Sequence, residues 1–367
     1  MSFLIIAFPS LLVVLVMKLL FQTTISTKEF FIHIGVTIVS VLICIALTYA
    51  AMYSTMMDSE ILNGHVQSKG IHKEYCGSGS SCTEYHWKEK CHYSTDSKGK
   101  RTKHCTSYKV YHYPWELFYN VKTTVGDYTI DRVDPQGVDT PPRFTQIKEG
   151  EIASDTHYYT NYLLANKDSL FYKWNDDPNI NKPNEMKKIP DYPEIEDYYN
   201  VQRVINSTSF NVPVLQTQQL LDTTLNTLGA EKQVNVLVIL YNYEDNYFVQ
   251  RTLMKWQGGK KNDVLMFFGI DKDLKVKYFS STSYAEGMNN AEMHSTLRMD
   301  NVDQKFSTAV VAKDLDTVRL MFSRLPAKEF EYLKLNMSPS LGAMIISSLL
   351  CLILSIICGY ILHREDF

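Results

Sequence analysis

This sequence has no excess of charge of either sign. Its 367 residues include 37 lysines and arginines against 40 aspartates and glutamates, which gives a formal net charge of −3. A protein that binds nucleic acid through its phosphates normally carries a basic excess or a basic patch. The balance of charge therefore predicts no nucleic acid partner.

The sequence also lacks the short motifs that mark common catalytic sites. It contains no Gly-x-Ser-x-Gly turn, no His-Glu-x-x-His motif and no complete phosphate-binding loop. Cysteine is scarce, at seven residues, and no two cysteines form a Cys-x-x-Cys pair. These absences favour a protein that holds partners over an enzyme, and they predict no cofactor.

The sequence does contain three long apolar runs, at residues 3–21, 30–53 and 341–362. At about 1.5 Å per helical residue, each is long enough to cross a hydrocarbon layer of roughly 30 Å. We interpret the runs as three transmembrane helices. Pro9 and Lys18 interrupt the first run, and a cleaved signal peptide is its alternative interpretation.

Charged residues beside these runs predict an orientation. Lys18 and Lys28 lie at the first connection, and Arg364 follows the last run. Because short cytoplasmic loops are enriched in lysine and arginine, both segments belong in the cytoplasm. Residues 54–340 are then expected on the outer, periplasmic side of a bacterial inner membrane, with a cytoplasmic C-terminus.

Four of the seven cysteines fall within thirty residues of this exported part: Cys76, Cys82, Cys91 and Cys105. An even number of cysteines outside the cytoplasm indicates disulfides. The turn residues DSKGK lie midway between Cys91 and Cys105, so one arrangement pairs these two across a hairpin and pairs Cys76 with Cys82. A nested arrangement pairs Cys82 with Cys91 and Cys76 with Cys105.

Zinc is the competing explanation for this stretch, because His86, His92 and His104 lie among the cysteines. The gaps between the four cysteines are five, eight and thirteen residues. Structural zinc sites usually place paired cysteines only about two to four residues apart. The spacing therefore favours disulfides, and no bound metal is expected.

Residues 54–175 are predicted to form a β-rich, disulfide-containing domain. Alternating residues in TSYKVYHY, WELFYNVKTT and GDYTIDRV predict strands, with a turn at Gly126-Asp127. Ser154 and Asp155 precede apolar residues at helical spacing, which predicts a helix over residues 154–174. The prolines of residues 176–200 predict an extended surface linker.

Residues 201–325 alternate between helical and strand patterns, which predicts an α/β domain. Leucines at helical spacing begin at Leu215, and Gly229 offers a stop. VNVLVILYNY predicts a buried strand, DNYFVQRTLMKWQ a helix, and DVLMFFGIDKDLKVKYFSS two strands around a turn. Two further helices, near residues 289–297 and 310–324, complete a sandwich.

This order of elements resembles the TPM domain, a family of membrane-anchored exported domains of bacteria and chloroplasts. The resemblance covers residues 211–324 and rests on NVLVILYNY, on Lys255-Trp256, on GGKKNDVLMFFGIDKDLKVKYF and on FSTAVVAKDLDTV. It implies an α/β/α fold, roles in complex assembly or repair and, for some members, acid phosphatase activity or calcium binding. INSTSFNVPV lacks the acidic residues that such members carry near the start of the domain.

The positions that could carry such a site are Asn262, Asp263, Asp271 and Asp273. An Asp-x-Asp pair at a hairpin is usually turn chemistry, and two carboxylates fall short of the roughly six to eight oxygens that calcium takes. The amides of GGKK at residues 258–261 could surround a phosphate, but the loop lacks the P-loop spacing.

Three linker acids are also candidates for acid–base chemistry: Glu194, Glu196 and Asp197. Without a cleft or a partner they are most simply a solvated face. His157 and His294 stand alone in the sequence.

The sequence thus predicts an α+β membrane protein with three transmembrane helices, a small disulfide-stapled β-rich exported domain and a TPM-like α/β/α sandwich. We interpret it as a membrane-anchored structural or interaction protein of the bacterial envelope, with a composition that also suits a bacteriophage gene. Small residues in the last run, among them Gly342, Ser355 and Gly359, allow close helix packing, so we expect a homo-oligomer or an envelope protein partner. The alternative is a TPM-type phosphohydrolase or calcium-binding domain with its site beside Asp263.

Overall fold

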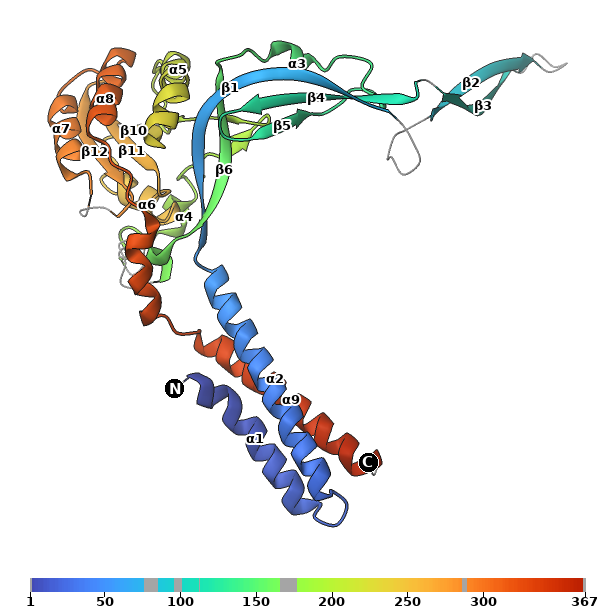
Figure 1. Cartoon of the computed structure of the whole chain (residues 1–367). Coiled ribbons are helices and arrows are strands. Elements are labelled where there is room, and N and C mark those ends of the chain that lie inside the picture. The colour runs from blue at the N-terminus through green and yellow to red at the C-terminus, as the bar shows by residue number, and fades with distance from the viewer. Residues whose placement is uncertain are drawn as a thin grey trace. The chain divides into compact units, whose positions relative to one another are not determined.

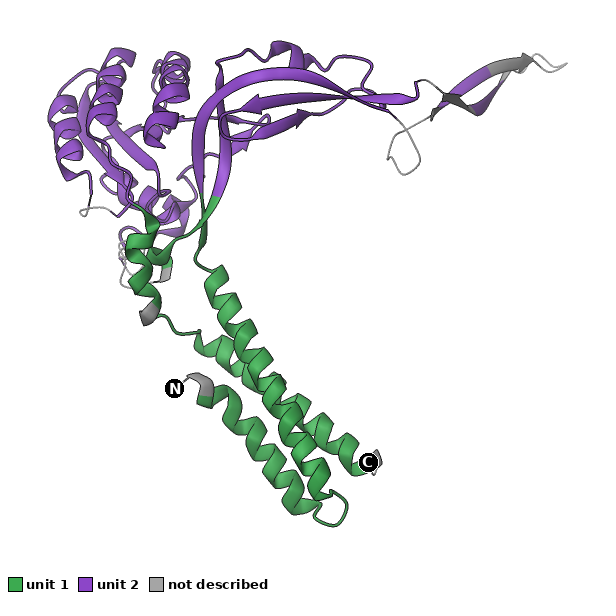
Figure 2. Cartoon of the chain, viewed as in Figure 1, with its two compact units in different colours: residues 1–59, 158–173, 326–367 green, residues 60–157, 174–325 purple. Residues whose placement is uncertain are grey.

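The computed structural model of the chain describes residues 2–75, 85–95, 101–111, 113–165, 177–285 and 289–365. The chain divides into two compact units (Figure 2). Residues 1–59, 158–173 and 326–367 form one, which we call the helical unit, and residues 60–157 and 174–325 form the other, the sheet unit. Cys76 and Cys82 lie outside the described residues.

Three helices make up most of the helical unit: α1 (Ser2–Leu20), α2 (Thr27–Ser54) and α9 (Leu341–Glu365). Two segments, Thr27–Ser54 and Leu341–Arg364, are long and apolar enough to cross a membrane. The apolar helix Leu4–Leu20 is shorter. All three predicted runs are helices, and two of them have the length and apolar composition that a span requires. The unit also contains two 3-10 segments, η1 (Tyr162–Ala165) and η2 (Ala327–Asn336).

Polar side chains join the three helices in their shared interior. His33 of α2 lies with its Nε2 2.9 Å from the backbone oxygen of Ser355 and 3.1 Å from the Ser355 hydroxyl. That hydroxyl donates to the backbone oxygen of Ser10 in α1. A Cβ on Gly359 would lie 2.9 Å from the His33 ring. Ser355 and Gly359 therefore serve packing within this chain, whereas a Cβ on Gly342 would meet nothing within 4 Å.

The first sheet of the sheet unit has the strand order β5-β4-β1-β6. Its strands are β5 (Asp127–Ile130), β4 (Trp115–Thr123), β1 (Met57–Tyr75) and β6 (Ile152–Thr160) (Figure 1). The strands predicted at WELFYNVKTT and GDYTIDRV are confirmed as an antiparallel pair joined at Gly126. The short helix α3 (Pro142–Gln146) contributes Phe144 to the small core on this sheet.

The helix predicted over residues 154–174 is wrong for residues 154–160, and residues 166–174 lie outside the described residues. Residues 152–160 form strand β6, and Ser154 and Asp155 lie within it rather than at a helix N-terminus. The amide of Val66 in β1 donates to the backbone oxygen of Glu151, at the start of this strand. The local residues suit either pattern, and pairing with a long neighbouring strand decides between them.

A separate two-stranded sheet is formed by β2 (Tyr85–Thr95) and β3 (Arg101–Tyr111). In this hairpin Cys91 lies opposite Cys105, and the two form a disulfide. This confirms the pairing predicted across the DSKGK turn and excludes the nested arrangement for these two cysteines. The pairing of Cys76 and Cys82 stays a prediction.

The second sheet has the order β12-β11-β10-β9. Its strands are β12 (Val276–Ser283), β11 (Asp263–Ile270), β10 (Asn235–Asn242) and β9 (Val204–Asn206). Strand β10 runs parallel to β9 and to β11, whereas β12 is antiparallel to β11. Because β10 and β11 are buried on both faces, their sequences are continuously apolar, as the sequence analysis expected.

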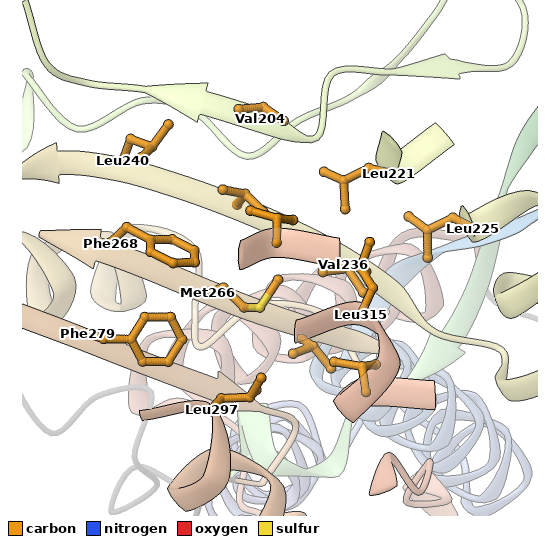
Figure 3. Packing of buried hydrophobic residues seen from close by; sticks show 14 of the residues in the cluster. Val204, Leu221, Leu225, Val236, Leu240, Met266, Phe268, Phe279, Leu297 and Leu315 are labelled. Atoms are coloured by element: carbon orange, nitrogen blue, oxygen red, sulfur yellow. The ribbon is translucent and has the colours of Figure 1, made fainter. Parts of the chain in front are cut away.

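Alternate residues of β10 face two different apolar cores, as the period of two in a strand requires. Val236 and Leu240 pack with three helices, α5 (Val214–Lys232), α7 (Ala291–Asn301) and α8 (Thr308–Met321). Figure 3 shows Leu221, Leu297 and Leu315 of these helices beside the sheet. Leu237 and Ile239 pack with α6 (Phe248–Lys255) on the opposite face. The predicted helices of residues 201–325 are confirmed. Helix α5 continues past Gly229 to Lys232, and its C-cap residue Gln233 has a φ of 52°.

Residues 176–200 are not a surface linker. The described part contains α4 (Pro183–Met186), β7 (Ile195–Glu196) and β8 (Asn200–Val201). Ile189 belongs to the α6-side core, and Tyr199 belongs to the core of the first sheet. This segment therefore joins the two predicted exported domains into one unit. Its buried side chains are unevenly spaced, so they give no periodic signal in the sequence.

Candidate functional site

Asp263, the centre of the alternative phosphohydrolase prediction, lies in the interior and is 1% exposed. Its carboxylate accepts hydrogen bonds from the Tyr192 hydroxyl at 3.0 Å, from Asn235 Nδ2 at 2.9 Å and from the Lys260 amide at 2.7 Å. Burial raises the pKa of Asp263 to about 6, against these hydrogen bonds, which lower it. The side chain is enclosed by its own protein and presents no open face to a substrate.

The neighbouring glycine-lysine loop is also used internally. The amides of Gly258 and Gly259 donate to the backbone oxygens of Leu253 and Trp256, and the Lys260 amide bonds to Asp263. Loop amides that already have acceptors are not available to surround a phosphate. Asn262 is fully buried, and its Nδ2 donates to the backbone oxygen of Ile61.

Asp271 and Asp273 lie at the other end of the same strand. Asp263 is the first residue of the eight-residue strand β11, and Asp271 directly follows its last residue. At about 3.3 Å per residue, the two are about 26 Å apart. The Asp271 carboxylate accepts from the amides of Asp273 and Lys275, which holds the turn and lowers the pKa of Asp271. The structure therefore does not bring the four predicted residues together into one site.

Two of the three linker acids, Glu194 and Glu196, line a cavity of about 490 Å³ whose walls also include Tyr192. Asp197 lies elsewhere, in an ion pair with Arg143 at 2.6 Å. No histidine or cysteine lines the cavity. The arrangement supplies carboxylates without a second catalytic group.

His294, predicted to stand alone, lies between two hydroxyl groups in the structure. Its Nδ1 is 2.8 Å from the Ser281 hydroxyl, and its Nε2 is 2.9 Å from the Ser283 hydroxyl. Burial lowers the pKa of His294 to about 4. The imidazole is therefore neutral near pH 7 and is a weak base for activating a serine.

Glu60 of β1 gathers the most concentrated set of charges in the described chain. Its side chain is fully buried, and its Oε1 is 2.8 Å from His157 Nδ1 and 3.0 Å from Lys261 Nζ. Arg324 Nη2 also pairs with this oxygen. The prediction that His157 stands alone is therefore wrong. No local pattern in the sequence points to this set, because its members lie up to 264 residues apart.

The position of this charge cluster in the chain indicates its role. Glu60 begins one segment of the sheet unit, His157 ends that segment, and Arg324 lies one residue before the end of the other. One carboxylate thus holds together three of the points where the chain enters or leaves the unit. A carboxylate shared by three donors holds these chain segments together, and we call it a structural joint. Because permanent cations neutralise it, it is poorly suited to acid–base catalysis.

A second polar network ties the first sheet to the second. Asn63 of β1 donates to the backbone oxygen of Val234 at 3.1 Å and to Asn235 Oδ1 at 3.0 Å. Its Oδ1 accepts from the Ser154 hydroxyl at 2.8 Å and from Arg203 Nη2 at 2.7 Å. Because Asn235 also binds Asp263, the predicted candidate residue belongs to this internal network.

The β2–β3 hairpin differs from these sites because its polar groups face outward. Residues 87–90 and 103–107 are exposed, including Trp87 at 61%. The strands pair with each other over eleven residues, and no other described strand joins their sheet. A two-stranded sheet is marginally stable alone, so the Cys91–Cys105 disulfide is its main stabilising link.

The same hairpin holds one grouping with metal-ligand atoms in reach of one another: Glu89, Cys91 and Cys105. The two cysteines are joined as a disulfide. A disulfide sulfur is not the thiolate that zinc requires. The hairpin therefore supports the disulfide interpretation over the zinc interpretation.

Comparison of the chain with protein-family models, with curated proteins and with solved structures finds no match. The resemblance of residues 211–324 to the TPM domain receives no support from these comparisons. The three-layer arrangement around the second sheet is a property of the structure alone.

Proposed function

We propose that this chain is a membrane-anchored interaction protein that holds a partner through the β2–β3 hairpin. The observation that carries the proposal is the hairpin itself. It is a disulfide-linked, two-stranded sheet whose described side chains are mostly exposed, and none of its described residues belongs to the three apolar cores of the two larger sheets. An ordered element of this kind gains its apolar burial only when a partner covers it.

The remaining polar sites support the same proposal. Asp263, Glu60 and Asn63 are buried and bonded to groups of their own chain. Buried hydrogen-bonded networks of this kind fix how sheets and loops pack on one another. Such networks make the sheet unit rigid, and they leave Asp263, Glu60 and Asn63 closed to a substrate.

The location of the partner follows from the anchors and the disulfide. The helices α2 and α9 are long and apolar enough to act as membrane anchors. Disulfides persist outside the reducing cytoplasm. We therefore place the sheet unit on the outer side of a bacterial inner membrane, where the partner is an envelope protein or a second copy of this chain.

Site-specific photocross-linking in bacterial membranes tests the proposal. A photoreactive residue replaces Trp87 on the hairpin, and a matched variant carries it at Met299, which is 82% exposed on α7. We expect protein adducts at position 87 and few at position 299. The Cys91→Ser, Cys105→Ser variant should lose the adducts at position 87. Absence of adducts at position 87, or equal adducts at both positions, would contradict an interaction role for the hairpin.

A further inference from the structure

We propose that the β2–β3 hairpin binds an extended, acidic segment of a partner protein, which adds as a third strand along a free edge of the hairpin. The inference rests on the proposed function and specifies how its partner is recognised. Three properties of the hairpin carry it: a strand edge that no other described strand joins, a basic charge and a structure that is held in advance of binding.

The register of the hairpin identifies the residues whose backbone groups point away from the partner strand. The Cα atoms of Cys91 and Cys105 are 4.0 Å apart, which is closer to the roughly 4.5 Å of a non-hydrogen-bonded pair than to the roughly 5.5 Å of a hydrogen-bonded pair. Residues in non-hydrogen-bonded pairs direct their N–H and C=O groups away from the partner strand. Pair types alternate along an antiparallel ladder, so Ser107 and Glu89, two residues from Cys105 and Cys91, also form a non-hydrogen-bonded pair.

These outward groups form a template for another strand. Counting further by two assigns the odd-numbered residues of 101–111 on β3 to the outer edge of that strand. No described strand pairs with either edge. A free edge of this length is a site for strand addition, in which main-chain hydrogen bonds provide affinity.

The edge strand of the second sheet differs from the edges of the hairpin. Strand β9 is also terminal in its sheet. There the side chain of Gln218 accepts hydrogen bonds from the amides of Arg203 and Val204, at 2.7 and 3.1 Å. A side chain therefore occupies the amides at that edge, whereas no described strand covers the edges of the hairpin.

The charge of the hairpin selects the chemistry of the partner. Among the described side chains of the hairpin, Lys88, Lys90 and Lys103 are exposed, against one exposed acid, Glu89. A second copy of the hairpin would place like charges opposite each other, which destabilises pairing. An acidic segment is attracted by the same charges, so its charge complements the hairpin.

A polypeptide also fits better than a lipid surface. Anionic lipids attract lysine through charge alone and leave the backbone groups of the edge unused. An added strand uses both the charges and the backbone. The disulfide holds the two strands in place before the partner arrives, which lowers the entropy that binding must overcome.

The test uses the full chain in detergent and a fluorescent peptide of alternating glutamate and threonine. We expect fluorescence anisotropy to show binding that weakens as salt is added, and we expect no binding of the matching lysine–threonine peptide. Ser107→Pro removes one outward N–H without removing a bond between β2 and β3. It should weaken peptide binding about tenfold, whereas Ser107→Ala should not change it.

Mass spectrometry of the Cys91–Cys105 disulfide checks that both variants form the hairpin. A second variant, Lys103→Glu, should weaken binding of the acidic peptide and strengthen binding of the basic one. Equal binding by Ser107→Pro and Ser107→Ala would overturn strand addition. Binding to phosphatidylglycerol vesicles without binding to the peptide would overturn the polypeptide partner.

The outcomes also separate this inference from the proposed function. Adducts at position 87 in membranes, together with no peptide binding, would refute strand addition by an acidic segment and leave the interaction role standing. Absence of adducts at position 87 would refute the interaction role and this inference with it.

Discussion

At the scale of single residues, the charges of this protein are mostly internal supports. Glu60 has no exposed surface, yet it accepts from His157, Lys261 and Arg324. A buried carboxylate is stable only when several donors offset its lost hydration. The same logic holds for Asp263, whose partners are neutral hydroxyl and amide groups.

Replacing Glu60 tests its role as a joint. Glu60→Gln leaves Lys261 and Arg324 without their shared carboxylate, so we expect the free energy of unfolding to fall by about 3 kcal/mol. Urea unfolding of the full chain in detergent, followed by tryptophan fluorescence, measures the change. Glu149→Gln, at an exposed acid of the same unit, is the control and should have no effect. Equal stability of the two variants would show that Glu60 is not a joint.

Asp314 of α8 should make the stability of the sheet unit depend on pH. It is 1% exposed and accepts from Asn301 Nδ2 at 2.8 Å. Burial raises its pKa to about 7, above its value of roughly 3.9 in the unfolded chain. The folded state thus binds the proton more tightly, so the Asp314 contribution favours folding at low pH and is lost as pH rises through about 7.

The Asp314→Asn variant should abolish this pH dependence. The free energy of unfolding of the variant, relative to that of the parent chain, should rise by on the order of 2 kcal/mol from pH 5 to pH 8. The reason is that asparagine needs no proton to stay neutral. Urea unfolding at both pH values measures the gain. Asp316→Asn, at an exposed position of the same helix, serves as the control. A gain that is the same at both pH values would contradict the assignment.

At the scale of elements, contacts between distant segments override local signals. Gly229 offers a helix stop in the sequence, but α5 passes through it to Lys232. A Cβ at Gly229 would lie 2.4 Å from Asn63 Cβ and 2.7 Å from the Asn63 backbone oxygen. The glycine is therefore needed where β1 crosses the helix, and helix termination is not its role.

Gly229→Ala should destabilise the sheet unit although alanine is the better helix former. We expect a loss of about 1–3 kcal/mol from the clash with β1, in excess of a helix-propensity gain of about 1 kcal/mol. Hydrogen exchange of the α5 amides in the full chain reports the loss. Gly70→Ala, where a Cβ would meet nothing within 4 Å, is the matched glycine control. Unchanged protection in Gly229→Ala would mean that β1 moves aside at no cost.

At the scale of the whole molecule, each unit has its own kind of interior. The sheet unit buries two apolar cores on the faces of its second sheet. The three long helices of the helical unit instead expose most of their large apolar side chains and share a small polar interior around His33 and Ser355. An apolar exterior with polar contacts between helices suits a hydrocarbon environment.

Gly359→Leu tests the packing of the three helices. The new side chain would meet His33 and Met17, so we expect the helical unit to lose about 1–3 kcal/mol and to unfold at a lower temperature in detergent. Gly342→Leu, at an open position of the same helix, should leave the unfolding temperature unchanged. If the two variants unfold at one temperature, α9 does not pack against α1 and α2 through Gly359.

The sequence by itself determined the features that depend on local pattern. Continuous apolar runs predicted α2 and α9, period-two alternation predicted β4 and β5, and a turn between Cys91 and Cys105 predicted their disulfide. Neighbouring residues carry all of that information. Only the tertiary structure decided that residues 152–160 pair as a strand with β1, that Ile189 and Tyr199 bury a supposed linker, and that Asp263 is enclosed. Each of these depends on groups far apart in the chain, and their contact energies leave no periodic trace in the sequence.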